Sequence, residues 1–248
     1  MTTEGGFIGP TAHLAQLPEV VVYADGRIFT PAPAPAIYPG PLVPVESVRD
    51  VGATGVAAIG AAITAAGLDT GGGTSSAIAP DAPDTVFTVR VGVQTVTTRF
   101  QALGIGGPGP GGPGGPGASS DPRRAAALAL LARLTDPTDT WGGPVSDATQ
   151  YVPTAYRIFV APGAPAASDP ATAQHPVAWP LTTPLASFGK PAQPDRGIAG
   201  LRVGVVTGAE AATLTPVLAA ANQLTAFTSG GASFTLYVSP LLPDELAP

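Results

Sequence analysis

Apolar and polar side chains alternate in two segments near the end of the sequence, and a helical stripe lies between them. The apolar residues at every second position are Leu201, Val203, Val205, Phe234, Leu236 and Val238. A period of two is typical of a strand with one face on a core. The residues at helical spacing between these segments are Leu214, Val217, Leu218, Ala221 and Leu224. Residues 201 to 239 therefore predict a strand, a helix and a strand, which is a βαβ unit.

The ends of that helix are marked by local signals. Thr207 precedes Glu210 by three positions, the spacing of a capping box at a helix start. Pro216 falls inside the stripe, where the missing N–H predicts either a kink or a start nearer Thr213. Gly230, in a Ser-Gly-Gly sequence, predicts the end of the helix and the turn into the second strand.

Two hairpins are predicted in the first half of the chain. Residues 20 to 29 contain two apolar runs on either side of Asp25-Gly26, a pair that suits a two-residue turn. Residues 85 to 100 contain two alternating runs separated by Gly92-Val93. Both patterns indicate antiparallel strands.

Two further helices are expected in this half, each with its own boundary signals. Residues 43 to 51 predict a strand, followed by a helix that Thr54 caps and Gly67 ends. Pro122 predicts the first position of another helix. Its inward-facing residues are expected to be Ala125, Leu128, Leu131 and Leu134.

These elements predict an α/β to α+β fold with two lobes, each a mixed β-sheet with helices on one face. Residues 1 to 17 are expected to form an N-terminal tail, and residues 18 to 160 the first α/β lobe. A mobile Gly/Pro loop is expected at 103 to 120, because that segment carries almost nothing that could be buried. The Pro- and Ala-rich residues 161 to 178 are expected to link this lobe to a second, βαβ lobe at 179 to 248.

Composition narrows the classes of partner. The formal net charge is −6, and only 11% of residues are charged. Nucleic-acid binding requires clustered Lys and Arg, so a nucleic-acid partner is not expected. The sequence has no cysteine, which removes disulfides and thiolate chemistry. No apolar run reaches the roughly 18 residues of a membrane-spanning helix, so no transmembrane segment is expected.

The sequence offers little that indicates catalysis. The two histidines, His13 and His175, lie in a predicted tail and a predicted linker, with no carboxylate pair nearby in sequence. Residues 104 to 109 match GxGxxG, but no helix follows and proline fills the turn. Asp81 and Asp84 suit loop turns better than a calcium site. We therefore expect no catalytic residues, no metal site and no cofactor.

Three arginines are candidates for a binding surface. Arg90, Arg157 and Arg202 each lie in a predicted strand at the parity opposite to the apolar residues. They could share an outer sheet face that holds an anionic glycan, a lipid head group or an acidic protein. The alternative is a solvated face on which arginine stems cover apolar surface and the guanidinium groups meet loop aspartates.

Several segments resemble one family. VVVYADGRIF, DTVFTVRV, VPTAYRIFV and the closing ANQLT, SGG and PLLPDE resemble exported, lipoprotein-like proteins of actinobacteria, a group without an established function. The resemblance implies a secreted or cell-surface location, with a signal peptide that has been removed. A lipid-bearing cysteine would precede the mature chain of such a protein, and this sequence contains none. A cytoplasmic location stays open.

The leading interpretation is a non-enzymatic, exported binding or accessory protein of the cell envelope, with a protein or an anionic glycan as partner. One alternative is an extracellular hydrolase with a site between the lobes. Another is a homo-oligomeric structural subunit whose strands pair at a sheet edge.

Overall fold

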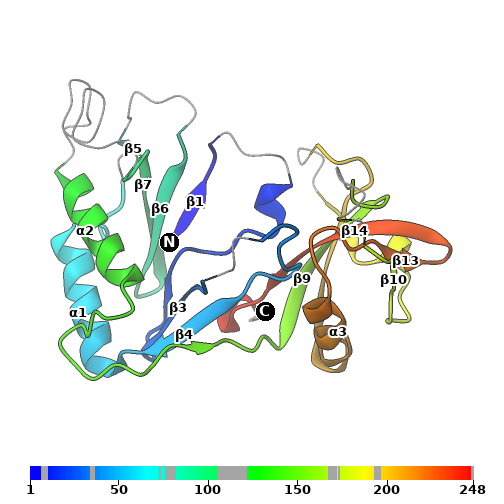
Figure 1. Ribbon diagram of the computed structural model, residues 1–248. Helices are drawn as coiled ribbons and strands as arrows, with labels where there is room; N and C mark the ends of the chain where they lie inside the picture. Colours follow the sequence, from blue (N-terminus) through cyan, green and yellow to red (C-terminus); the bar gives the residue numbers. More distant parts are fainter. Residues whose placement is uncertain are drawn as a thin grey trace. The chain divides into compact units, whose positions relative to one another are not determined.

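The computed structural model describes residues 1–6, 11–33, 37–72, 74–75, 82–104, 122–166, 172, 174–192 and 197–246. Within these residues, three α-helices accompany three β-sheets, so the predicted α+β class is confirmed (Figure 1). None of the helices in these ranges is long and apolar enough to cross a bilayer. The predicted Gly/Pro loop lies outside the described residues from 105 onward.

The chain divides into two compact units whose boundaries differ from those expected. The first unit comprises Met1–Ile8, Pro18–Ala32 and Glu46–Gln150, and the second comprises Gly9–Leu17, Pro33–Val45 and Tyr151–Pro248. The expected linker at 161 to 178 is part of the second unit, and so are residues 155 to 160, which were expected in the first lobe and which belong to strand β9 (Ala155–Pro162). The physical reason is strand pairing, because that strand hydrogen-bonds only to later strands.

The first unit contains a sheet built on the predicted hairpin at 85 to 100. Strands β6 (Asp84–Val91) and β7 (Gln94–Gln101) are antiparallel, and Val91 pairs with Gln94 across the turn. The short strands β1 (Thr2–Glu4) and β5 (Thr74–Ser75) lie at its two edges. Strand β5 runs parallel to β7, which makes this sheet mixed.

The second sheet of the first unit contains the other predicted hairpin. Its strands lie in the order β2 (Val21–Val22), β3 (Arg27–Pro31), β4 (Glu46–Asp50) and β8 (Thr149–Gln150). The turn is longer than the expected two residues, since the Gly26 amide donates to the Tyr23 carbonyl and Tyr23 N–H donates to the Arg27 carbonyl. Gly26 has a φ of +104°, a backbone conformation that favours glycine.

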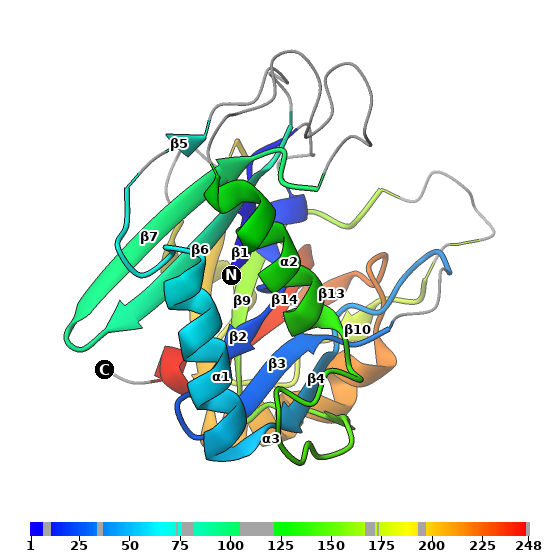
Figure 2. The same cartoon turned by 90° about the vertical axis from the view of Figure 1, so that its left-hand side faces the viewer.

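Helices α1 (Gly52–Ala65) and α2 (Arg123–Thr135) contribute to the core of the first unit, together with β6 and β7 (Figure 2). Helix α1 begins two residues before Thr54, and the Asp50 carboxylate accepts the Gly52 N–H. The predicted cap at Thr54 is therefore wrong. The buried residues of α2 are Arg124, Ala127, Leu130 and Leu134. Of the four expected residues only Leu134 is among them, because the run AAALALL offers apolar side chains on nearly every face.

The second unit is built on one six-stranded sheet. Its order is β10 (Val177–Ala178), β13 (Phe227–Ser229), β14 (Ala232–Pro240), β9 (Ala155–Pro162), β12 (Arg202–Thr207) and β11 (Lys190–Pro191). Strand β9 is antiparallel to both β14 and β12, so these two strands are parallel to each other with β9 between them. The predicted βαβ unit is therefore present, but a strand from earlier in the chain separates its strands.

Helix α3 (Gly208–Ala220) covers one face of this sheet (Figure 1). Its buried residues Leu214 and Leu218 join Ile158 and Val160 of β9 in one apolar cluster. Thr207 is the N-cap residue, as predicted, but its side chain makes no capping hydrogen bond. Pro216 lies inside the helix, which nevertheless begins at Gly208 rather than near Thr213.

The opposite face of the same sheet has a smaller apolar cluster. It contains Leu14 from the short 3-10 helix η1 (Ala12–Leu14), together with Phe159, Ala161 and Leu201. Residues 11 to 17 are thus attached to the second unit rather than forming a free tail. Both faces of the sheet are partly covered, and this decides where the candidate arginines point.

Candidate functional site

Arg157 and Arg202 lie on neighbouring strands but on opposite faces of the sheet. Arg157 of β9 is directly across from Val205 of β12, whereas Arg202 of β12 is across from Val160 of β9. Residues that face each other across a ladder share a face, and side chains alternate along each strand. Arg157 therefore shares a face with Phe159, and Arg202 shares the face that α3 covers. These two arginines do not form the shared surface that we expected.

Arg202 holds a loop in place. Its Nε and Nη2 donate to the carbonyl oxygens of Phe188 and Gly189, at 2.8 and 3.0 Å. Those two residues directly precede β11. The guanidinium group thus fixes the position of that edge strand.

Arg90 belongs to the other unit. It lies on β6 across from Thr95 and is exposed. The other strand arginines of that unit are bound by protein groups. Arg99 pairs with Glu4 and Asp84, and Arg27 pairs with Asp25. These pairs fit the alternative interpretation, in which strand arginines meet nearby carboxylates.

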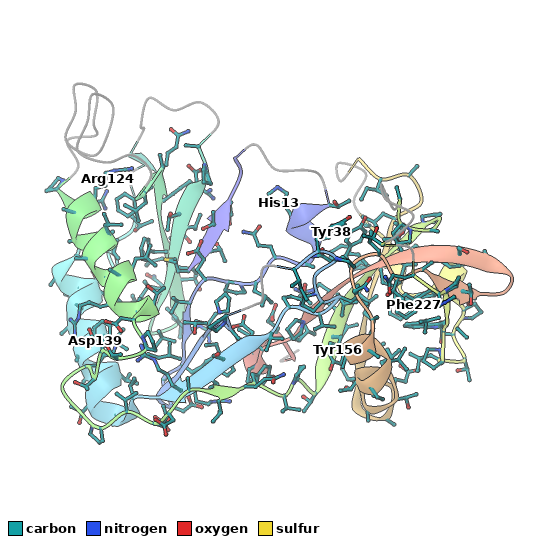
Figure 3. The ribbon with its side chains drawn as sticks, in the orientation of Figure 1. His13, Tyr38, Arg124, Asp139, Tyr156 and Phe227 are labelled. Atoms are coloured by element: carbon teal, nitrogen blue, oxygen red, sulfur yellow. The ribbon has the colours of Figure 1, made fainter. Side chains whose placement is uncertain are left out.

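The face of Arg157 contains a pocket of about 710 Å³. All of its lining belongs to the second unit, and it comes from η1, β9, β11, β12 and β14. The lining residues that carry the argument are His13, Arg157, Phe159, Lys190, Val203 and Val205. Figure 3 shows His13 on η1 and Tyr156 on β9. Tyr156 belongs to the α3 face, where its hydroxyl lies 3.0 Å from Thr215 Oγ1.

Arg157 occupies the middle of a row across three strands. Val205 lies opposite it on one side and Ser239 of β14 on the other. Its Nη2 donates to Oε1 of Glu245 at 3.1 Å. The second oxygen of Glu245 accepts the Leu242 N–H at 2.9 Å, which fixes the carboxylate beside the guanidinium group. Arg157 therefore presents a positive charge whose position is set by the sheet.

Helix η1 is anchored to the same face. The hydroxyl of the buried Ser239 donates to the Leu14 carbonyl at 3.4 Å. His13 Nδ1 lies 3.3 Å from Oε1 of Gln16. Burial raises the pKa of Tyr237, whose hydroxyl also hydrogen-bonds Thr11. These contacts hold His13 at the edge of the pocket.

Three elements thus bring basic side chains to one pocket. His13 comes from η1, Arg157 from β9 and Lys190 from β11. No acidic residue lines the pocket within the described part of the chain, although Glu245 meets Arg157 beside it. Lys190 is the only lysine of the sequence and makes no ion pair with any described residue. Such a lining favours the binding of an anion.

The floor of the pocket is apolar. Val203 and Phe159 face each other across β12 and β9. Val205 is 52% exposed and lies near the end of β12, beyond the part of that strand that pairs with β11. Leu14 and Ala192 complete this surface. The arrangement can hold a charged group at one place and cover apolar surface beside it.

Sequence reasoning identified Arg157 but neither His13 nor Lys190 as a member of this site. His175 is exposed and lies outside the pocket lining. Asp81 lies outside the described residues, and Asp84 pairs with Arg99. Among the residues described, no three His, Asp or Glu side chains gather as a metal site would require.

In comparisons with known proteins, no family model, no curated protein and no solved structure matches this chain.

Proposed function

We propose that this protein is a non-enzymatic binding or accessory protein of the cell envelope that holds an acidic ligand in the pocket beside Arg157. The observation that carries the proposal is the basic lining. His13, Arg157 and Lys190 converge from three separate elements on a protein whose net charge is −6. Negative charges elsewhere on the surface would repel anions. A local positive site therefore directs an acidic ligand to this pocket.

The guanidinium group of Arg157 and the ammonium group of Lys190 both suit a carboxylate or phosphate ligand. A guanidinium group offers a planar set of donors that matches either group, and an ammonium group adds a compact charge. Arg157 uses Nη2 for Glu245, and the sheet fixes the direction of the remaining donors. Because the floor around it is apolar, a bound charge would be less screened there than on an open surface.

The location at the cell envelope rests on the family resemblance of the sequence. Secretion followed by retention at the cell surface would place the pocket among acidic glycans and lipids. Fractionation of the producing cell tests this part, with the protein followed by immunodetection. Recovery only from the cytoplasm would contradict an envelope role and would leave anion binding to be judged separately.

Titration calorimetry on the full chain tests the binding role. The probes are acetate, inorganic phosphate, galacturonate and octanoate. We expect at least one of them to bind, and we expect Arg157→Gln and Lys190→Gln each to weaken that binding about tenfold, since each removes a charged hydrogen-bonding partner. Arg90→Gln is the matched control, because it removes one positive charge from an exposed site outside the pocket. Equal affinity in all three variants would overturn the proposal.

A further inference from the structure

The size of the pocket exceeds the needs of a simple anion. Its volume of about 710 Å³ falls within the roughly 300 to 1,000 Å³ of sites for small organic molecules. Acetate or phosphate would satisfy the basic side chains and leave most of this space to water. The other side chains that line the pocket therefore indicate the chemistry of the rest of the ligand.

Charged and apolar lining are arranged in adjacent rows of the sheet. One row pairs Val205 with Arg157, and the next row on the same face pairs Val203 with Phe159. Two residues along a strand span about 7 Å, so the apolar pair begins about 7 Å from the basic residue along the strands. A ligand that uses both rows needs an acidic end and an apolar body longer than that spacing.

The polar lining is too sparse for a sugar chain. Besides the three basic residues, the polar side chains of the lining are Gln16, which lies 3.3 Å from His13 Nδ1, and Ser239, which donates its hydroxyl to the Leu14 carbonyl. The other side chains of the lining are apolar: Leu14, Phe159, Ala192, Val203 and Val205. A glycan carries hydroxyl groups around every ring, and covering them without hydrogen bonds is costly. An apolar part of a ligand that covers the exposed Val205 would bind favourably, because it removes apolar surface from water.

We infer that the ligand is an amphiphilic organic acid whose carboxylate or phosphate binds Arg157 and Lys190 and whose apolar body lies over Phe159, Val203 and Val205. This inference rests on the proposed function and narrows its ligand class. In place of the anionic glycan or the protein expected as partner from the sequence, the ligand is then a molecule with a hydrocarbon or aromatic segment.

A chain-length series tests the inference on the full protein. The probes are butanoate, hexanoate, octanoate and decanoate, measured by titration calorimetry below their micellar concentrations. Transfer of a methylene group from water to an apolar site contributes about 0.8 kcal/mol, which corresponds to about fourfold in affinity per methylene. We expect that slope until the floor is filled. A flat series overturns the amphiphilic ligand.

Two comparisons separate this inference from the function on which it rests. If galacturonate binds as tightly as octanoate and both need Arg157, the protein binds anions but the amphiphilic class is wrong. If octanol binds as tightly as octanoate, or no acid binds, the anion site itself is wrong and both proposals fall. Tight octanoate binding, with octanol and galacturonate at least tenfold weaker, supports both.

A polar isostere of Val205 provides a second readout. Val205→Thr keeps the shape and places a hydroxyl group on the floor, and the side chain is exposed enough that folding should be retained. We expect octanoate to bind about three- to tenfold more weakly and acetate to be unaffected. Val93→Thr on the exposed β6–β7 turn is the control. Equal octanoate affinity in Val205→Thr and the wild type contradicts the assigned floor.

Free fatty acids and lipid head groups share this chemistry, and sedimentation with vesicles distinguishes them. The vesicles contain phosphatidylcholine with or without phosphatidylglycerol. Binding of monomeric octanoate without co-sedimentation identifies a free acid as the ligand. Co-sedimentation that requires phosphatidylglycerol and is lost in Arg157→Gln identifies a lipid head group. Sedimentation that is independent of Arg157 contradicts a role of this pocket in lipid binding.

Discussion

Glu245 Oε1 lies 3.1 Å from Nη2 of Arg157, so an acidic group of the protein already occupies one side of the main cation of the pocket. The Leu242 N–H holds the other oxygen of Glu245 in place. An acidic ligand that uses the whole guanidinium fork must compete with this carboxylate. Glu245 therefore limits affinity for any anion bound at Arg157.

Replacing Glu245 by glutamine should strengthen the binding of an acidic ligand. Glu245→Gln removes the competing charge, and we expect octanoate affinity to rise about three- to tenfold. Both side chains of the pair are about one-third exposed, so the free energy of unfolding should change by less than about 1 kcal/mol. Titration calorimetry and urea unfolding measure the two quantities.

The control for Glu245→Gln is Glu210→Gln. It changes the net charge equally, and Glu210 is an exposed residue of α3 outside the pocket lining. A similar rise in octanoate affinity in both variants would show a general charge effect rather than competition at Arg157.

Gly26 should not tolerate a side chain. A Cβ atom there would lie 2.5 Å from Oδ1 of Asp50, and the φ of +104° disfavours other residues. We expect Gly26→Ala to lower the free energy of unfolding by about 1–3 kcal/mol. Gly60→Ala in α1 is the opposite case, since nothing lies within 4 Å of its Cβ position apart from the adjacent residues and the helix's own backbone. It should raise that free energy by about 0.4–1 kcal/mol. Urea unfolding of both variants checks the pair, and equal effects would contradict the turn geometry.

Arg133 stabilises the first unit by covering Trp141. Its guanidinium carbon lies 3.8 Å from the centroid of the buried Trp141 ring, and its Nε pairs with Asp139 at 2.6 Å. We expect Arg133→Ala to lower the free energy of unfolding by about 1–2 kcal/mol. Arg133→Lys should recover only part of this, because an ammonium group cannot reproduce the planar contact.

The two tryptophans make this measurement specific to one unit. Trp141 lies in the first unit and Trp179 in the second. In a Trp179→Phe background, fluorescence during urea unfolding reports on Trp141 alone. A midpoint of this signal that is unchanged by Arg133→Ala would contradict the stabilising role.

The contribution of Asp139 should disappear in acid. The hydrogen bond from Arg133 holds the pKa of Asp139 below its ordinary value of 3.8. A lowered folded-state pKa contributes stability that is complete above the unfolded value and is lost as the pH falls through the folded value. The destabilisation caused by Asp139→Asn should therefore be full at pH 7 and shrink below about pH 4.

Urea unfolding at pH 7, 4 and 2.5 tests this dependence. In an Arg133→Gln background the same substitution should show a much weaker dependence on pH, because the main cause of the shift is absent. A penalty for Asp139→Asn that stays constant down to pH 2.5 would argue against the ion pair as its origin.

Local signals in the sequence located several elements, but Gly230 lies in the turn between β13 and β14 and does not mark the end of α3, which is at Ala220. Asp25-Gly26 and Gly92 mark turns because only a few residues allow positive φ, and both hairpins are present. Thr207 correctly marks the start of α3. The buried face of α2 could not be predicted from the sequence, because alanine and leucine fill most of its positions.

The faces of Arg157 and Arg202 could not be predicted, because both faces of their sheet are partly buried. Val203 and Val206 are apolar residues of opposite parity on β12, and they contact different clusters. Alternation shows that two faces exist but does not show which arginine faces which cluster. The convergence of His13, Arg157 and Lys190 depends on contacts between distant segments, for which a single sequence carries no local signal.

The position of β9 has a consequence for biosynthesis. Tyr156 of this strand pairs with Val206 on one side and Pro240 on the other, and both partners are made later. Until they emerge, a segment that contains Ile158, Phe159 and Val160 has two open hydrogen-bonding edges, which invites association with other nascent chains. We expect this segment to be prone to association until synthesis has passed residue 240.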